Sequence, residues 1–313
     1  MRHRLLIQQG ALSPALQARL QEKYETQQLP GPGAERDAFL AANGKGWEAI
    51  ATNAGYGCDA QLASSLPDLR VVSSLGVGLD KFDLPALTER GIVVGYTPEV
   101  LNDAVADLAF ALLLALSRRI VAADGFVRRG DWPSKQFPIA TQVAGKKLGI
   151  LGLGRIGSVV ARRASGFDME VRYHNRSPVA DSPFVHERTA SGLAAWADFL
   201  VIVTAGGPQT RHLVSREVLD ALGPQGYLIN VSRGPVVDEA ALIEYLQQKR
   251  IAGAGLDVFE KEPQVPEALR QLDNVVLSPH IGSQTEETRA AMAQRVIDNL
   301  EAYFAGQALP SAA

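Results

Sequence analysis

The 313-residue sequence is poor in cysteine, with Cys58 as its one thiol. A single cysteine excludes an internal disulfide framework and a thiolate cage for a metal ion. His, Asp and Glu form no cluster with metal-ligand spacing either, so no metal is predicted. A reducing, cytoplasmic compartment is therefore expected.

Long apolar runs and concentrated positive charge are also missing. The longest uninterrupted apolar stretch, Leu108 to Leu116, is far shorter than the ~20 residues that span a bilayer. The formal net charge is −3, from 31 Lys and Arg against 34 Asp and Glu, and no segment gathers a basic run. We therefore predict neither a membrane nor a nucleic acid as a partner.

The residues that are present predict an α/β protein. Hydrophobic residues make up 46% of the chain, and its length suits two domains. Short apolar runs alternate with helical or turn-rich stretches, which is typical of parallel sheets. The expected strands are Leu5–Ile7, Trp47–Thr52, Val71–Leu75, Ile92–Gly95, Leu148–Leu151, Glu170–Tyr173, Phe199–Val203, Tyr227–Val231, Gly253–Asp257 and Val275–Leu277. Helices are expected at Ser13–Tyr24, Asn102–Arg119 and Thr285–Phe304, and an irregular arm at Asp131–Thr141.

A glycine-rich turn follows the strand expected at Leu148–Leu151 and precedes a helical stretch. The Gly-x-Gly-x-x-Gly pattern allows a tight turn, a close approach of backbone to a pyrophosphate, and close packing of helix on strand. Such a trio alone is weak evidence, but here it lies in the required strand–turn–helix context. The predicted cofactor-binding residues of this turn are Gly152, Gly154, Arg155, Ile156 and Gly157.

The next predicted strand ends without an acidic residue. Sites that prefer NAD carry Asp or Glu about 20 residues after the glycines, to bind the ribose 2′-hydroxyl. This sequence has Asn175, Arg176 and Ser177 there instead. One guanidinium and two neutral polar groups suit a 2′-phosphate, which a carboxylate would repel. The prediction is NADP as cofactor, with NADPH preferred over NADH; the alternative is that Arg176 only faces solvent.

Three later segments place a reactive side chain close to glycine or proline, near the ends of predicted strands. Together with Leu69–Asp80, Ala106–Ala109 and the glycine turn, they resemble the D-isomer-specific 2-hydroxyacid dehydrogenase family. The similarity covers most of the chain and is greatest to the glyoxylate/hydroxypyruvate and hydroxyphenylpyruvate reductase branch. The three segments are Asn230–Pro235, Gly255–Pro263 and Leu277–Ser283.

Chemistry gives Arg233, Glu262 and His280 the catalytic roles that this resemblance supports. The planar guanidinium of Arg233 can bind the carboxylate of a 2-oxo acid and polarise its ketone oxygen. A protonated His280 can supply the proton that this oxygen needs as hydride arrives. Glu262 would orient the imidazole and favour its charged form. Each residue alone also has a structural explanation, as a turn, loop or capping residue, and the assignment depends on their joint appearance.

The resemblance implies further contacts and an architecture. It implies that Asp257 holds the nicotinamide end and that the backbone of Leu75, Gly76, Val77 and Gly78 binds the substrate carboxylate. Val231 and Ser232, just before Arg233, are also predicted to contact the cofactor.

The implied architecture is two Rossmann-like domains with an active-site cleft between them, each a parallel sheet flanked by helices. A flavodoxin-like substrate-binding domain would comprise residues 1–98 plus 286–313, and an NADP-binding Rossmann domain residues 99–285. The resemblance also implies a homodimer, for which Asn102–Arg119 and the following arm are the interface candidates. Relatives place a partner's tryptophan in the stretch before the glycine-rich strand, but Phe137–Ala144 contains none.

The predicted function is NADPH-dependent reduction of glyoxylate or hydroxypyruvate to the D-2-hydroxy acid. A bulkier substrate such as hydroxyphenylpyruvate is the main alternative. An NAD-linked biosynthetic dehydrogenase, for example one acting on phosphoglycerate, is disfavoured by Asn175 and Arg176. A nucleotide-sensing binding protein without catalysis also remains, because fold does not fix function.

Overall fold

The computed structural model describes residues 2–313, so Met1, the first residue of the predicted substrate-binding domain, lies outside it. The chain forms two units. The first runs to Leu101 and resumes at Thr285–Ala313, and the second is Asn102–Gln284. No helix within residues 2–313 is both long and apolar enough to cross a membrane.

The first unit is built on a five-stranded parallel sheet with strand order β2-β1-β3-β4-β5. This is the order of the flavodoxin-like doubly wound sheets. Its strands are β1 (Arg4–Gln8), β2 (Glu25–Leu29), β3 (Ala49–Asn53), β4 (Val71–Leu75) and β5 (Val93–Gly95). Its helices are α1 (Pro14–Lys23), α2 (Ala34–Asn43), α3 (Ala60–Ser64), α4 (Leu84–Glu89) and α12 (Glu286–Phe304).

Both faces of this sheet are buried, because successive strand residues point to opposite sides and helices cover each side. Leu5 and Ile7 pack on one face with Val296 and Leu300 of α12, whereas Leu6 packs on the other face. Helix α12 begins after Thr285, whose hydroxyl accepts a hydrogen bond from the amide of Thr288. The last long helix of the chain therefore covers one face of a sheet that is formed by the first hundred residues.

The second unit is built on a seven-stranded parallel sheet with strand order β12-β11-β10-β9-β6-β7-β8. The order reverses between β6 and β9, which is the switch point where ligands bind in such sheets. Its strands are β6 (Lys147–Leu151), β7 (Glu170–His174), β8 (Val185–His186), β9 (Phe199–Ile202), β10 (Tyr227–Asn230), β11 (Gly253–Leu256) and β12 (Val275–Leu277).

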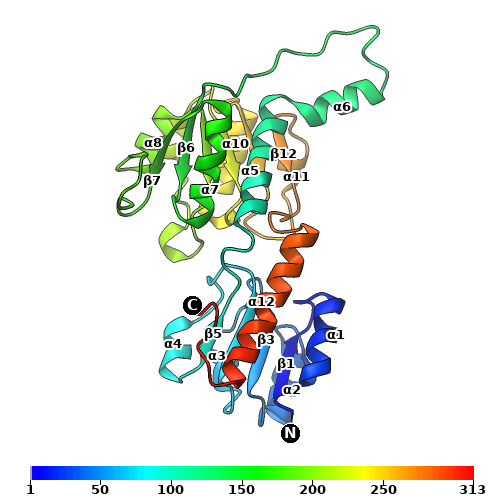
Figure 1. Ribbon diagram of the computed structural model, residues 1–313. Coiled ribbons are helices and arrows are strands. Elements are labelled where there is room, and N and C mark those ends of the chain that lie inside the picture. Colours follow the sequence, from blue (N-terminus) through cyan, green and yellow to red (C-terminus); the bar gives the residue numbers. More distant parts are fainter. Residues whose placement is uncertain (1) are drawn as a thin grey trace. The chain divides into compact units, whose positions relative to one another are not determined.

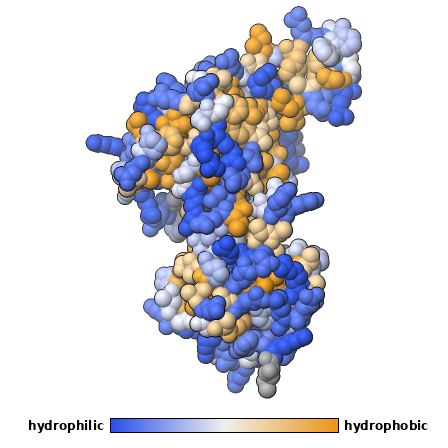
Figure 2. All heavy atoms as spheres, in the orientation of Figure 1, coloured by the Kyte–Doolittle hydropathy of each residue, from blue (hydrophilic) through white to orange (hydrophobic). Residues whose placement is uncertain are grey.

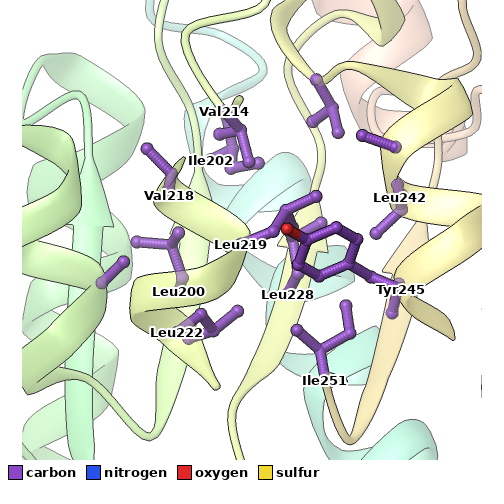
Figure 3. Close-up of a cluster of buried hydrophobic side chains, with 14 of the residues drawn as sticks. Leu200, Ile202, Val214, Val218, Leu219, Leu222, Leu228, Leu242, Tyr245 and Ile251 are labelled. Carbon is purple, nitrogen blue, oxygen red and sulfur yellow. The ribbon is translucent and has the colours of Figure 1, made fainter. Parts of the chain in front are cut away.

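Helices flank this sheet, and α5 lies buried against it with contacts to β10, β11, β12 and α7 (Figure 1). A cluster around Leu219, Leu228 and Tyr245 fills the space between strands and α9 and α10 (Figure 3). The α-helices are α5 (Asn102–Ser117), α6 (Ile120–Arg128), α7 (Arg155–Ala164), α8 (Ala190–Trp196), α9 (Arg216–Leu222), α10 (Glu239–Gln247) and α11 (Glu267–Arg270). Short 3-10 helices follow at Ser165–Phe167, Pro208–Thr210 and Gly234–Val236.

The predicted α/β fold of two parallel sheets flanked by helices is confirmed, but strands β2 and β8 and helix α6 were not among the elements expected from the sequence. Strand β2 reads Glu-Thr-Gln-Gln-Leu and lies at a sheet edge, where exposed positions do not need apolar residues. Strand β8 has two residues and is too short for any pattern. Helix α6 begins after Arg119, whose left-handed φ of 54° interrupts the expected helix, so that α5 ends at Ser117.

We expect Leu228→Ala, in the middle of the second unit's sheet, to lower the free energy of unfolding by about 2–5 kcal/mol, because Leu228 is fully buried and its loss leaves a cavity. Chemical denaturation of the purified variant measures this change. Val185→Ala is the control in the same sheet, since Val185 is 54% exposed and its truncation is expected to cost less than about 0.5 kcal/mol. Equal losses for the two variants would contradict this account of the core.

Candidate active site

The three fingerprint glycines meet three different steric demands between β6 and α7. Gly152 has φ 107°, and a Cβ there would lie 2.8 Å from the backbone of Thr204. A Cβ on Gly157 would lie 2.2 Å from the carbonyl oxygen of Gly152. At Gly154, by contrast, a Cβ would meet nothing within 4 Å. Two glycines are therefore needed for packing within the protein, and the third lies at open space before the N-terminus of α7, where an anion is favoured.

The side chain of Asn175, just after β7, is bound to this glycine-rich loop. Its Oδ1 accepts a hydrogen bond of 2.7 Å from the amide of Leu153, and its Nδ2 donates one of 3.3 Å to the Leu153 carbonyl. Both ends of the amide therefore hold the loop between Gly152 and Gly154. A direct contact of Asn175 with a ribose stays a prediction, whereas its contact with the loop is observed.

Arg176 and Ser177, the next two residues, are exposed. The guanidinium of Arg176 donates a hydrogen bond to the side chain of Gln209, which lies in the 3-10 helix Pro208–Thr210. This helix follows β9, the strand across the switch point from β6. A positive group is thus held near the carboxyl ends of the strands that flank the glycine-rich loop.

Asn230 organises the segment that carries Arg233 after β10. Its Oδ1 accepts hydrogen bonds from the amide and the hydroxyl of Ser232, both of 3.0 Å. Its Nδ2 donates to the carbonyl of Arg233 over 3.1 Å. The stem of Arg233 passes over Gly206, where a Cβ would come within 2.7 Å of it. The backbone of Arg233 is therefore fixed, and its stem runs along a surface that only a glycine leaves open.

The buried carboxylate of Asp257, after β11, binds the loop that follows β12. It accepts hydrogen bonds from the hydroxyl of Ser278 (2.6 Å) and the amides of Ile281 (2.8 Å) and Gly282 (2.9 Å). Burial raises the pKa of Asp257 above its ordinary value, although these hydrogen bonds oppose the shift. The carboxylate oxygens are thus used within the protein, and a contact with nicotinamide stays a prediction.

His280 lies in the loop that Asp257 holds. Its backbone has φ 53°, in the left-handed region that is uncommon for residues with a side chain, and its amide donates to the Asp257 carbonyl over 2.8 Å. Nδ1 of His280 lies 2.7 Å from Oε2 of Glu262. An ionised carboxylate only accepts hydrogen bonds, so Nδ1 carries a proton. Nε2 is therefore the ring nitrogen that can donate a proton to a ligand or accept one from it.

Glu262 is fixed from two sides. The amide of Phe259 donates to its Oε1 over 3.0 Å, while Oε2 binds His280. Burial, the largest single cause, raises the pKa of Glu262, whereas the hydrogen bond and charge of His280 lower it. The Phe259 amide and the charge of Arg233 act in the same direction, and the pKa is lowered overall. Glu262 is therefore ionised at neutral pH and interacts electrostatically with both other predicted catalytic residues.

The predicted substrate-binding backbone lies in the first unit, directly after β4. Gly76 has φ 126°, and a Cβ there would lie 2.9 Å from the Cβ of Ala54. The amide of Gly76 donates to the hydroxyl of Thr97 over 2.9 Å. A glycine is thus required at this turn by conformation and by space.

The predicted site residues thus follow the carboxyl ends of parallel strands in both units. Sequence reasoning did not identify the residues that hold them, because a single polar side chain or backbone amide near a strand end carries no distinct pattern. The supporting residues it missed are Thr97, Gln209, Asn230, Phe259 and Ser278. The predicted ones lie at the end of β4 (Leu75 to Gly78) and after β6 (Gly152 to Gly157), β7 (Asn175 to Ser177), β10 (Val231 to Arg233), β11 (Asp257 and Glu262) and β12 (His280).

A parallel sheet with a glycine fingerprint at its switch point defines a dinucleotide-binding protein of the Rossmann class. The family described as "D-isomer specific 2-hydroxyacid dehydrogenase, NAD binding domain" matches residues 110–282. The chain belongs to the D-isomer-specific 2-hydroxyacid dehydrogenase family. The predicted family and enzyme class, an NAD(P)-dependent 2-hydroxyacid dehydrogenase, are confirmed.

Two curated relatives come from plants. The chain is 49% identical over 275 residues to glyoxylate/hydroxypyruvate reductase A of Arabidopsis thaliana, with 88% of each chain covered. It is 47% identical over 298 residues to hydroxyphenylpyruvate reductase of Plectranthus scutellarioides, with 95% of each covered. Among solved structures, an NADPH-dependent glyoxylate/hydroxypyruvate reductase from Sinorhizobium meliloti, in complex with NADP and malonate, superposes with a TM-score of 0.93. It is 40% identical, and the match covers 100% of this chain and 97% of that one.

We expect Gly157→Ala to weaken dinucleotide binding at least about tenfold, because the new methyl group displaces the carbonyl of Gly152 and with it the turn that is predicted to bind the pyrophosphate. Fluorescence titration with NADPH measures the dissociation constant. Gly166→Ala is the control, since a Cβ there meets nothing within 4 Å. If both variants bound NADPH like the unchanged protein, the fingerprint would not be the dinucleotide site.

Proposed function

We propose that this protein uses NADPH to reduce a small 2-oxo acid, glyoxylate or hydroxypyruvate, to the 2-hydroxy acid, which for hydroxypyruvate is the D isomer. The observation that carries the proposal is the 2.7 Å pair of Glu262 and His280, with Glu262 ionised and held by the Phe259 amide. The two residues follow β11 and β12, strands of the sheet that carries the dinucleotide fingerprint. Hydride addition to a ketone needs a positioned proton donor beside a nicotinamide, and the pair provides that donor.

The dinucleotide-binding residues fit NADPH. Open space in front of Gly154 and the N-terminus of α7 suit the pyrophosphate, and Asn175 fixes the loop that would receive it. Arg176 and Ser177 offer a cation and a hydroxyl to a 2′-phosphate, with no carboxylate at this position to repel it. The Sinorhizobium meliloti structure, which contains NADP, supports the same choice.

The catalytic roles follow from the charges in the second unit. When bound, NADPH supplies the hydride that adds to the keto carbon. Arg233 binds the substrate carboxylate and polarises the ketone oxygen, and protonated His280 donates the proton that completes the hydroxyl group. Glu262 keeps the imidazole oriented through its 2.7 Å contact with Nδ1. Asp257 fixes the loop around His280. The backbone of Leu75 to Gly78 is the proposed contact for a substrate carboxylate, as the family resemblance implies.

The size of the substrate has two candidates. The Arabidopsis and Sinorhizobium relatives act on glyoxylate and hydroxypyruvate by name, which favours a small side chain. The Plectranthus relative, nearly as similar and matched over more of the chain, is a hydroxyphenylpyruvate reductase and keeps an aryl substrate as the second candidate.

We also propose a homodimer that works in the cytoplasm. Large apolar side chains lie exposed on α6 and the following arm, among them Trp132 (70%) and Ile139 (99%). Figure 1 shows α6 and the following arm extending away from the sheet of the second unit. In Figure 2 apolar residues lie on the surface of this segment, among polar ones. Such surface indicates an interface, and a second copy is the partner that the family resemblance implies. The single cysteine fits a reducing compartment.

The proposal is tested by following oxidation of NADPH and NADH with glyoxylate, hydroxypyruvate, pyruvate and hydroxyphenylpyruvate. We expect the fastest turnover with NADPH and one of the first two acids, and a loss of roughly 10²–10⁴-fold in kcat for His280→Ala, because the proton donor is removed. His3→Ala is the matched control, since His3 also pairs with a glutamate, Glu48, at 3.1 Å in the first unit. The proposal fails if no oxo acid is reduced while NADPH binds, or if His280→Ala keeps full activity.

The cofactor preference has its own test. We expect Arg176→Ala to raise the KM for NADPH about tenfold and to leave the KM for NADH within twofold, because only the 2′-phosphate needs the guanidinium. Arg270→Ala, which removes an exposed arginine from the last turn of α11, is expected to change neither. Equal losses for the two cofactors in Arg176→Ala would assign Arg176 a role unrelated to the 2′-phosphate.

A further inference from the structure

Three consecutive backbone groups in the turn after β4 form hydrogen bonds: the carbonyl of Leu75, the amide of Gly76 and the carbonyl of Gly76. The carbonyl of Leu75 accepts from the amide of Ala54 over 3.1 Å. The amide of Gly76 donates to the hydroxyl of Thr97 over 2.9 Å, and the carbonyl of Gly76 accepts from the amide of Thr97 over 3.0 Å. Thr97 therefore binds Gly76 twice, through its side chain and through its backbone.

Thr97 is well placed for this task. It follows β5, the strand next to β4 in the sheet, and it is fully buried. Its partner Gly76 has the left-handed φ of 126°, so the peptide after it is turned away from the direction of the strand. Without the threonine hydroxyl, the amide of Gly76 has no other acceptor within residues 2–313. The hydroxyl thus fixes a backbone conformation that the strand itself does not dictate.

The next two amides have no such partner. Within the part of the chain that the structure describes, neither Val77 nor Gly78 donates its amide to any acceptor. Both residues are half-buried. Successive amides after a left-handed residue form an anion-binding concavity, and a carboxylate is the anion that the proposed substrate carries.

We propose that Thr97 is a positioning residue for substrate binding: its hydroxyl fixes Gly76 so that the amides of Val77 and Gly78 face the carboxylate of the 2-oxo acid. The proposal rests on the proposed function and goes beyond it by naming the side chain on which that backbone contact depends. Thr97 does not touch the substrate; it acts through Gly76. Its loss therefore weakens binding of carboxylates and leaves the proton donor and the dinucleotide-binding residues in place.

The test uses Thr97→Val, which keeps the shape of the side chain and removes the acceptor for the Gly76 amide. We expect the KM for the preferred 2-oxo acid to rise at least about fivefold, with kcat and the KM for NADPH within twofold of the unchanged enzyme. Inhibition by malonate, an unreactive dicarboxylate, is expected to weaken by the same factor. Thr97→Ser restores the hydroxyl and is expected to restore the KM.

Thr52→Val is the matched control. Thr52 is also fully buried in the same sheet, and its hydroxyl donates a hydrogen bond to the carbonyl of Gly57 over 3.4 Å. We expect its KM for the oxo acid to stay within twofold, so that a general weakening of the sheet is separated from loss of the Gly76 contact.

The outcomes separate this proposal from the proposed function. If the unchanged protein reduces the oxo acid and Thr97→Val keeps its KM and its malonate inhibition, the role of Thr97 is refuted while the function stands. A rise in KM that Thr97→Ser does not reverse also refutes it. If the unchanged protein reduces no oxo acid, the proposed function fails. The anion site is then still tested by comparing how far malonate raises the thermal unfolding temperature of Thr97→Val and of Thr52→Val. Equal protection would overturn the role of Thr97.

Discussion

The rest of the candidate site depends on the hydrogen bonds that the buried carboxylate of Asp257 accepts from the loop after β12. Three hydrogen bonds from residues 278–282 wrap the loop after β12 around this one group, at the end of the neighbouring strand. The same strand end leads into the turn that carries Glu262. One strand therefore fixes both members of the Glu262–His280 pair. Burying a charge without such partners would be costly, so the loop and the carboxylate stabilise each other.

A common device recurs at the strand ends of both units. A short polar side chain at or just after the end of one strand binds the backbone that follows the same strand or its neighbour, as Asn175 binds Leu153, Asn230 binds Ser232, and Thr97 binds Gly76. Parallel strands end at one edge, so these contacts fix several loops at the edge where ligands bind. The glycines supply conformations that other residues cannot adopt, and the polar side chains hold those conformations in place.

The sequence was sufficient to predict the strands with a repeating apolar pattern and the motifs whose residue types are chemically specific. Alternating apolar runs predicted ten of the twelve strands, and glycine spacing with Arg233, Glu262 and His280 predicted the family. The edge strand β2 escaped because exposed positions place no demand on hydrophobicity, and β8 because two residues make no period. The holding role of Asn175 could not be predicted, because a polar residue after a strand serves equally as a ligand or as a loop contact, and only coordinates distinguish the two.

The order in which the two units can fold follows from the path of the chain. Residues 102–284 are contiguous, and all the strands of their sheet are present once that stretch has been synthesised. The first unit is translated first but lacks α12, whose Val296, Ile297 and Leu300 belong to the core on one face of its sheet. That face stays uncovered until residues 286–304 leave the ribosome, so the unit that begins the chain is the last to complete its core.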